Sequence, residues 1–118
     1  MGALTARDVV VVSFPFSDLS YSKLRPAVVL AYSGRDDWIL CQITSKAYGD
    51  QRAVMIRDEN FEIGALRLTS YARPGKLFTA NSSIIRYQVG KLHKNVHSEI
   101  IAAIVELLYS DFTQETNQ

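Results

Sequence analysis

Short apolar runs separated by polar turns fill most of the chain. The run Asp8 to Phe16 is rich in β-branched and aromatic residues and predicts a first strand, which Pro15 brings to an edge or an end. Pro26 to Ala31 and Trp38 to Thr44 predict the second and third strands. We expect polar loops over 17–24 and 45–52, and a turn over 33–37.

The alternation continues to about residue 91. It predicts strands over 53–56, 65–71, 77–80 and 84–89, with a turn region over 57–64. The Pro-Gly pair predicts a further turn at Arg73 to Lys76. Many short strands at a spacing of roughly ten residues indicate a small barrel or sandwich.

From Asn95 onward the apolar period lengthens to three and four residues, which predicts one amphipathic C-terminal helix. Its apolar stripe consists of Val96, Ile100, Ile101, Ile104, Leu107 and Leu108. We expect the polar tail 113–118 to fray. The predicted fold class is α+β, mainly β, in a single domain over 1–118.

The 118 residues carry a net charge of only +1, so any nucleic-acid surface must be local. The apolar runs are far shorter than the roughly 20 residues of a membrane span, and the start does not resemble an export signal. We therefore expect a cytoplasmic protein without membrane association. The single cysteine, Cys41, could be a catalytic thiol, but its apolar surroundings favour a buried structural role.

Most catalytic signatures are missing from the sequence. His93 and His97 are spaced to bind a metal, but a third ligand is not evident, and a solvated helix start explains them as well. No Gly-rich phosphate loop or Gly-x-Ser-x-Gly motif occurs. We expect neither a metal nor a cofactor.

Polar residues at the predicted strand ends are the remaining candidates for chemistry. They are Arg25, Thr44, Ser45 and Arg73, with Lys23, Lys46, Tyr48, Tyr71 and Lys76 around them. Such residues can build an RNA-cleaving site, because RNA supplies the 2′-hydroxyl nucleophile and a guanidinium matches the charge that develops on the phosphate oxygens. From spacing alone, the favoured interpretation is that Arg25 is a surface arginine and Thr44 an ordinary strand residue.

Several sequence words in order resemble the PemK/MazF family of toxin–antitoxin ribonucleases, over about residues 7 to 110. The matching words are Asp8-Val-Val-Val-Val, Lys23-Leu-Arg-Pro-Ala-Val-Val-Leu, Cys41-Gln-Ile-Thr-Ser-Lys, Ser70-Tyr-Ala-Arg-Pro-Gly-Lys-Leu-Phe-Thr and Val89-Gly-Lys-Leu. The resemblance implies an SH3-like antiparallel β-barrel, a homodimer, metal-independent cleavage of single-stranded RNA, and silencing by an antitoxin with an acidic or disordered tail. It also implies catalytic roles for Arg25, Thr44 and Ser45.

The remaining cationic and aromatic residues are expected to bind RNA: Lys23, Lys46, Tyr48, Arg52, Tyr71, Arg73 and Lys76. Several relatives carry an acidic residue and a Gln in the loop just before the arginine, where this chain has Ser20-Tyr21-Ser22-Lys23-Leu24. We assign Arg25 to charge stabilisation, because its high pKa suits proton transfer poorly, and leave the general base open.

Two other functions share this fold. One is a barrel without catalysis that binds RNA or a peptide through Tyr21, Tyr48 and Tyr71. The other is a gyrase poison, but toxins of that kind end their helix in a Trp, whereas here the helix ends in Tyr109-Ser-Asp-Phe112.

Overall fold

The computed structural model describes residues 3–15, 22–46 and 49–116. The strands and helices follow one another in the order β1 (Asp8–Pro15), β2 (Ser22–Gly34), β3 (Asp37–Thr44), β4 (Val54–Ile56), the 3₁₀ turn η1 (Asp58–Asn60), β5 (Phe61–Gly64), β6 (Ser70–Asn81), the 3₁₀ turn η2 (Ser82–Ile84), β7 (Ile85–Leu92) and α1 (Lys94–Thr116).

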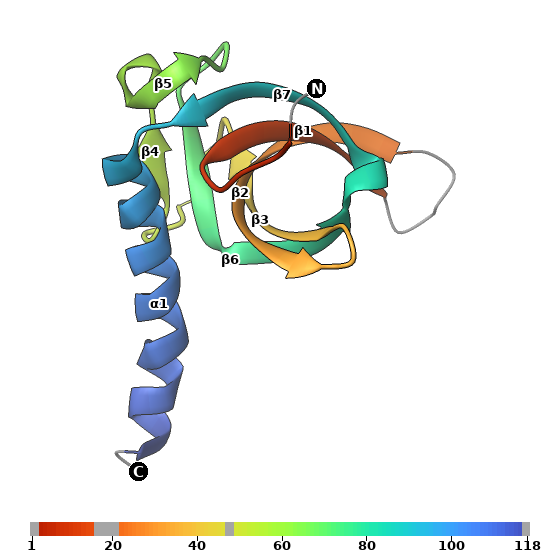
Figure 1. The fold of residues 1–118 in the computed structure, drawn as a ribbon. Coiled ribbons are helices and arrows are strands. Elements are labelled where there is room, and N and C mark those ends of the chain that lie inside the picture. The colour runs from red at the N-terminus through yellow and green to blue at the C-terminus, as the bar shows by residue number, and fades with distance from the viewer. Residues whose placement is uncertain (1–2, 16–21, 47–48, 117–118) are drawn as a thin grey trace.

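The strands form one antiparallel sheet in the order β4-β6-β3-β2-β1-β7-β5. Figure 1 shows this sheet curled into a ring, with α1 standing along one side of it. The predicted fold class, a small antiparallel β-barrel with a C-terminal helix, is confirmed.

Several local predictions were wrong. β2 begins at Ser22, so the predicted loop over 17–24 gives way to a strand earlier than expected, and 17–21 lie outside the described residues. The predicted turn region 57–64 contains β5, which can pair with β7 because Gly64 and Gly90 face each other; a Cβ on Gly90 would lie 2.4 Å from the Ile63 carbonyl oxygen. The strand predicted over 65–71 begins only at Ser70.

The predicted turn at Arg73 to Lys76 is instead a bulge within β6. On β3 a single residue separates Cys41 from Ile43, whereas their partners on β6, Leu77 and Ala72, are separated by four residues. The extra residues bend the strand and interrupt the ladder, which suits Pro74 because it has no N–H to donate. The Pro-Gly signal therefore marked a real irregularity of the backbone but not a chain reversal.

Apolar side chains are buried on both faces of the curled sheet. On one face, Val9 of β1 and Val28 of β2 pack in a cluster that includes residues of α1. On the other face, the neighbouring Val10 and Val29 belong to a second cluster, built from β1, β2, β3, β6, β7 and the turn η2. Because side chains along a strand alternate between the two faces of the sheet, consecutive valines pack in different apolar clusters.

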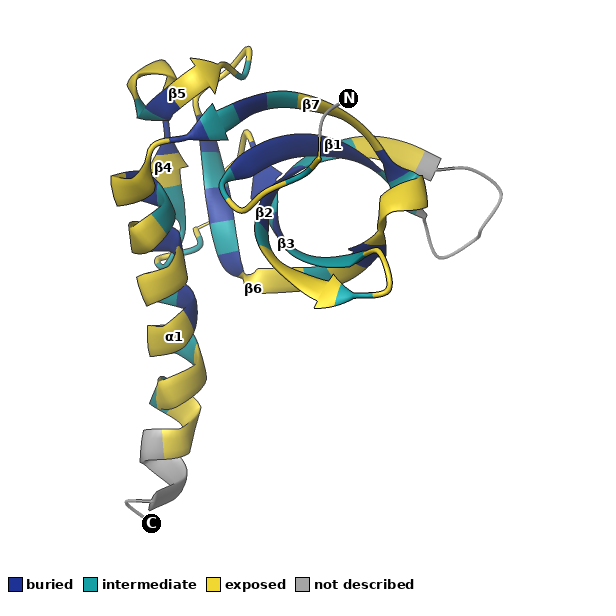
Figure 2. Ribbon diagram, viewed as in Figure 1, coloured by how far each residue is buried: buried dark blue, intermediate teal, exposed yellow. Residues whose placement is uncertain are grey.

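Helix α1 buries one side of its apolar stripe and exposes the other. Val96, Ile100 and Ile104 are buried against the sheet, and His97 Nε2 lies 3.3 Å from the Val29 carbonyl oxygen. Ile101 and Leu108 were expected in the buried stripe but are exposed, together with Val105, Tyr109 and Phe112. The exposed outer side of the helix is visible in Figure 2. The helix continues to Thr116, and the fraying of the polar tail 113–118 stays a prediction.

No helix among the described residues is long and apolar enough to cross a membrane.

Candidate functional site

The start of β2 and the end of β3 enclose a hollow of about 280 Å³. It is lined by Lys23, Leu24, Arg25, Pro26, Ile43, Thr44, Ser45 and Lys46. Ala27 of β2 lies opposite Gln42 of β3. Continuing this antiparallel register by two residues places Arg25 beside Thr44. Two words separated by about twenty residues in the sequence thus meet because β2 and β3 are neighbouring strands.

The charged residues among the described lining of the hollow are all cations. Arg25 is half-buried, while Lys23 and Lys46 are exposed at its rim. None of the described residues that line it is acidic. A phosphate entering the hollow would therefore meet three cations among the described lining residues, although the chain as a whole carries only +1.

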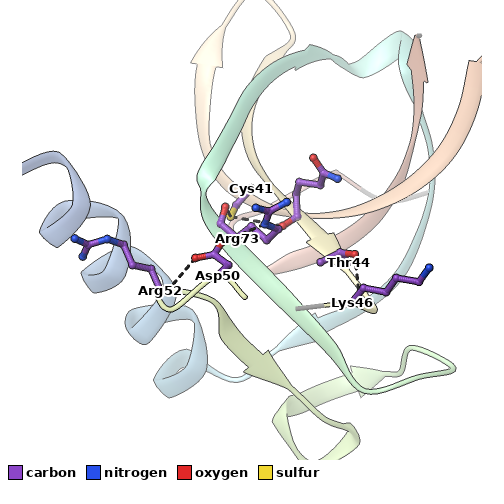
Figure 3. Close-up of polar contacts among 7 residues, drawn as sticks. Cys41, Thr44, Lys46, Asp50, Arg52 and Arg73 are labelled. Carbon is purple, nitrogen blue, oxygen red and sulfur yellow. Dashed lines mark hydrogen bonds and ion pairs between the residues drawn. The ribbon is translucent and has the colours of Figure 1, made fainter. Parts of the chain in front are cut away.

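The Thr44 hydroxyl is oriented by the backbone. Its Oγ1 accepts a hydrogen bond from the Lys46 N–H at 3.2 Å, as Figure 3 shows, and the side chain is largely buried. A hydroxyl that accepts one hydrogen bond keeps its own proton to donate. Thr44 is thus placed to donate to an anion held in the hollow.

Not every predicted RNA-binding residue reaches this hollow. Arg52 and Arg73 instead line a second cavity of about 820 Å³, between β6, the segment 49–52 and α1. There Arg73 Nε donates to Asp50 Oδ2 at 3.1 Å, and Arg52 Nη1 lies 3.5 Å from Glu106 Oε1. The two arginines are therefore paired with carboxylates that the sequence analysis did not consider.

Two further predicted residues, Tyr71 and Lys76, lie on β6. Tyr71 is half-buried and is the register partner of Thr44, and Lys76 is exposed in the β6 bulge. Tyr48, and Tyr21 of the alternative binding function, lie outside the described residues. Asp50 was missed because a lone aspartate after a glycine in a polar loop carries no signal of its long-range partner.

Cys41 has the buried structural role that the sequence favoured. Its thiol donates to the Arg73 carbonyl oxygen at 3.1 Å. Burial raises the pKa of the thiol to about 12, and the nearby Asp50 charge acts in the same direction. A thiol held protonated in this way is a poor nucleophile.

The two histidines, His93 and His97, lie in different environments. His93 is exposed, whereas burial lowers the pKa of His97 below its usual 6.5. Among the described residues, no three His, Cys, Asp or Glu side chains gather closely enough to hold a metal ion.

A family model described as PemK-like, MazF-like toxin of type II toxin–antitoxin systems matches residues 5–108. The chain belongs to this family. No curated protein sequence matches this PemK/MazF chain.

Solved structures similar to this PemK/MazF chain include a MazE–MazF complex from Deinococcus radiodurans. The match has 19% sequence identity and a TM-score of 0.73, and it covers 92% of this chain and 97% of that chain. MazF from the same organism gives 18% identity and a TM-score of 0.72, with 92% and 98% covered. An endoribonuclease in complex with its cognate antitoxin from a mycobacterial species gives 16% identity and a TM-score of 0.67, with 92% and 95% covered. At these identities the likeness establishes the shared fold.

Cys41 should be unreactive in the folded protein. Because its pKa is raised to about 12, almost no thiolate is present near neutral pH, and burial blocks access as well. We expect iodoacetamide to modify Cys41 at pH 8 only after the protein is unfolded in guanidinium, as measured by mass spectrometry. Rapid modification of the native protein would contradict the structural role.

Proposed function

We propose that this PemK/MazF chain is the toxin of a type II toxin–antitoxin system and cleaves single-stranded RNA without a metal. The observation that carries the proposal is the meeting of Arg25 and Thr44 in one hollow that no described acidic residue lines. Family membership supports the toxin role, and the metal independence follows from the resemblance.

In the proposed reaction, the 2′-hydroxyl of RNA attacks the adjacent phosphorus and the bond to the 5′-oxygen breaks. The products are a 2′,3′-cyclic phosphate and a 5′-hydroxyl, with the proton of the 2′-hydroxyl passing to a base and a proton reaching the leaving oxygen. The Arg25 guanidinium binds the non-bridging oxygens as their charge grows, and the Thr44 hydroxyl donates to the same oxygens. Ser45, exposed beside Thr44, is the third predicted member of the site.

Purified protein should cut single-stranded RNA in excess EDTA and leave these ends. Arg25→Ala should lose roughly a hundredfold or more in rate, because a preorganised donor to a developing anion is lost. Arg25→Lys should recover little, since one ammonium lacks the forked donors of a guanidinium. Gel assays with mapped ends provide the measurement, and strict dependence on added divalent metal would refute the mechanism.

The role of Thr44 is tested in the same assay by a matched pair of valine substitutions. Thr44→Val removes the hydroxyl with little change of shape and should slow cleavage by about a hundredfold. Thr79→Val makes the same change at an exposed position of β6 outside the hollow and should cleave like the parent. If RNA binds but no variant or parent cuts it, the protein is a binding module instead.

We further propose that the protein is a homodimer that uses the exposed side of α1. Leu108 is 63% exposed and Phe112 58% exposed, in line with Ile101 and Val105 along the helix. An apolar stripe of this length on one chain marks an interaction surface. The resemblance to the PemK/MazF family implies that the partner is a second copy of this chain.

Leu108→Glu should therefore shift the protein towards monomer, because a carboxylate would be buried at the contact. Leu68→Glu is a matched control, since Leu68 is 66% exposed and belongs to the segment between β5 and β6. Sedimentation at micromolar concentration gives the measurement. A parent protein that is monomeric, or equal behaviour of the two variants, would overturn the proposal.

The antitoxin is proposed to bind the same hollow as RNA, through an acidic tail. Lys23, Arg25 and Lys46 form a local cationic surface, so attraction should weaken as salt rises. Lys23→Glu combined with Lys46→Glu should weaken both RNA cleavage and binding of a Glu- and Leu-containing peptide. The control, Arg57→Glu with Arg67→Glu, changes exposed charges outside the hollow. Unchanged peptide binding with impaired cleavage would place inhibition elsewhere on the barrel.

A further inference from the structure

Three residues on three neighbouring strands form a row across the sheet that begins at Thr44. Thr44 of β3 is the register partner of Tyr71 of β6, and Tyr71 is in turn the register partner of Met55 of β4. Side chains of directly opposed residues lie on the same face of a sheet, with their Cβ atoms about 4.5–5.5 Å apart. Tyr71 is therefore the next side chain beyond Thr44 on this face, and Met55 follows it.

This row faces away from helix α1. The residues one position along each strand, Ile43, Ala72 and Val54, are also register partners, and they pack in the apolar cluster that includes residues of α1. Because side chains along a strand alternate between the two faces, the row lies on the opposite face. Figure 3 shows Thr44 and α1 on opposite sides of β6.

The outer two members of the row are accessible to a ligand. Tyr71 is half-buried, and Met55 is 43% exposed. Arg57 Nε donates to Met55 Sδ at 3.1 Å, which restrains a side chain that is otherwise flexible. A phenol ring and a restrained thioether therefore extend the site from Thr44 towards the edge of the sheet.

The cationic hollow ends where this row begins. Lys23, Arg25 and Lys46 supply charge for a phosphate, and Thr44 both lines the hollow and neighbours Tyr71. Proteins that hold single-stranded nucleic acid combine these two features, because cations follow the phosphates and aromatic rings stack on the bases. A nucleotide whose phosphate lies beside Thr44 thus has an aromatic ring within reach of its base.

We propose that Tyr71, supported by Met55, is a stacking platform for an RNA base that flanks the scissile phosphate. This inference rests on the RNA-cleaving function proposed above. It gives the expected RNA-binding residue Tyr71 a defined contact, and it adds Met55, which the sequence analysis did not single out. Because stacking strength differs among bases, the platform contributes to the choice of the cleaved sequence.

Binding of an RNA that cannot be cut tests the platform. A short RNA that the parent cleaves at one site is made uncleavable by a 2′-deoxy sugar at that site. Tyr71→Ile, which keeps a strand-forming residue but removes the ring, should weaken its binding by roughly ten- to a hundredfold, and Tyr71→Phe should bind like the parent. Tyr32→Ile is the matched control, since Tyr32 is 55% exposed at the opposite end of β2 from Arg25.

Removing single bases from the same RNA identifies the stacked one. In the parent, an abasic nucleotide next to the deoxy position should weaken binding by about tenfold or more. In Tyr71→Ile the same abasic nucleotide should cost almost nothing further, because the ring and the base are the two partners of one interaction. If every abasic position costs the same in the parent and in Tyr71→Ile, the proposal is overturned.

The support by Met55 has its own matched pair. Met55→Ala should weaken binding several-fold, because the ring loses its apolar neighbour on β4. Ile63→Ala removes a similar exposed side chain from β5, outside the row, and should bind like the parent. Equal affinities of Met55→Ala and the parent would remove Met55 from the platform.

The salt dependence of binding distinguishes a lost stack from a disturbed hollow. Loss of a phosphate contact in Lys46→Gln should reduce the slope of log affinity against log salt by about one, whereas Tyr71→Ile should keep the parent slope. A reduced slope in Tyr71→Ile would show that the substitution acts through the cations and would overturn the proposal.

A tryptophan at the same position gives a test that does not need a ringless variant to fold. The emission of Tyr71→Trp, beyond that of the parent, should be quenched by the intact RNA and not by the RNA that lacks the flanking base. Absence of this quenching would contradict the platform.

Two outcomes separate the platform from the rest of the proposed function. A parent that binds RNA with this base-specific coupling but cuts none would refute RNA cleavage and leave the platform in place. Equal RNA affinity of Tyr71→Ile and the parent, with weakened binding of the Glu- and Leu-containing peptide, would assign the ring to the antitoxin and overturn the proposal.

Discussion

Burial of β1 and β2 on both faces is the constraint on which this molecule depends. Consecutive valines of these strands enter two different apolar clusters, so neither face of the sheet can be left to solvent. The sheet must curl around one cluster, and α1 must cover the other. Removing apolar area from water contributes about 25 cal/mol per Å². That burial holds the adjacent ends of β2 and β3 in a fixed relation, and the candidate site is built on those ends.

The distribution of charge matters more here than its sum. Acidic residues pair with arginines at several places away from the hollow: Glu62 lies 3.7 Å from Arg7, Asp50 pairs with Arg73, and Glu106 with Arg52. At the ends of β2 and β3, the described residues that line the hollow include three cations and no acidic residue. A chain of nearly zero net charge can therefore present one region that attracts a polyanion, while exposed pairs elsewhere add little to stability.

The bulge of β6 connects the parts of the structure. Its first residue receives the Cys41 thiol and pairs with Asp50, Pro74 is fully buried, and a Cβ on Gly75 would lie 3.6 Å from Leu107 of α1. Strand β3, Asp50 and the C-terminal helix thus meet at this bulge.

The sequence by itself determined the strand pattern, the closing helix, the buried nature of Cys41 and the candidates Arg25 and Thr44, because side-chain periodicity and short family words are local properties. It could not distinguish a turn from a bulge at Pro74, since both use the same residues and only the partner strand decides. Nor could it assign Arg73 and Arg52, whose carboxylate partners lie 23 and 54 residues away. Such pairings depend on which strands and helices become neighbours, and that is settled only when the two cores are packed.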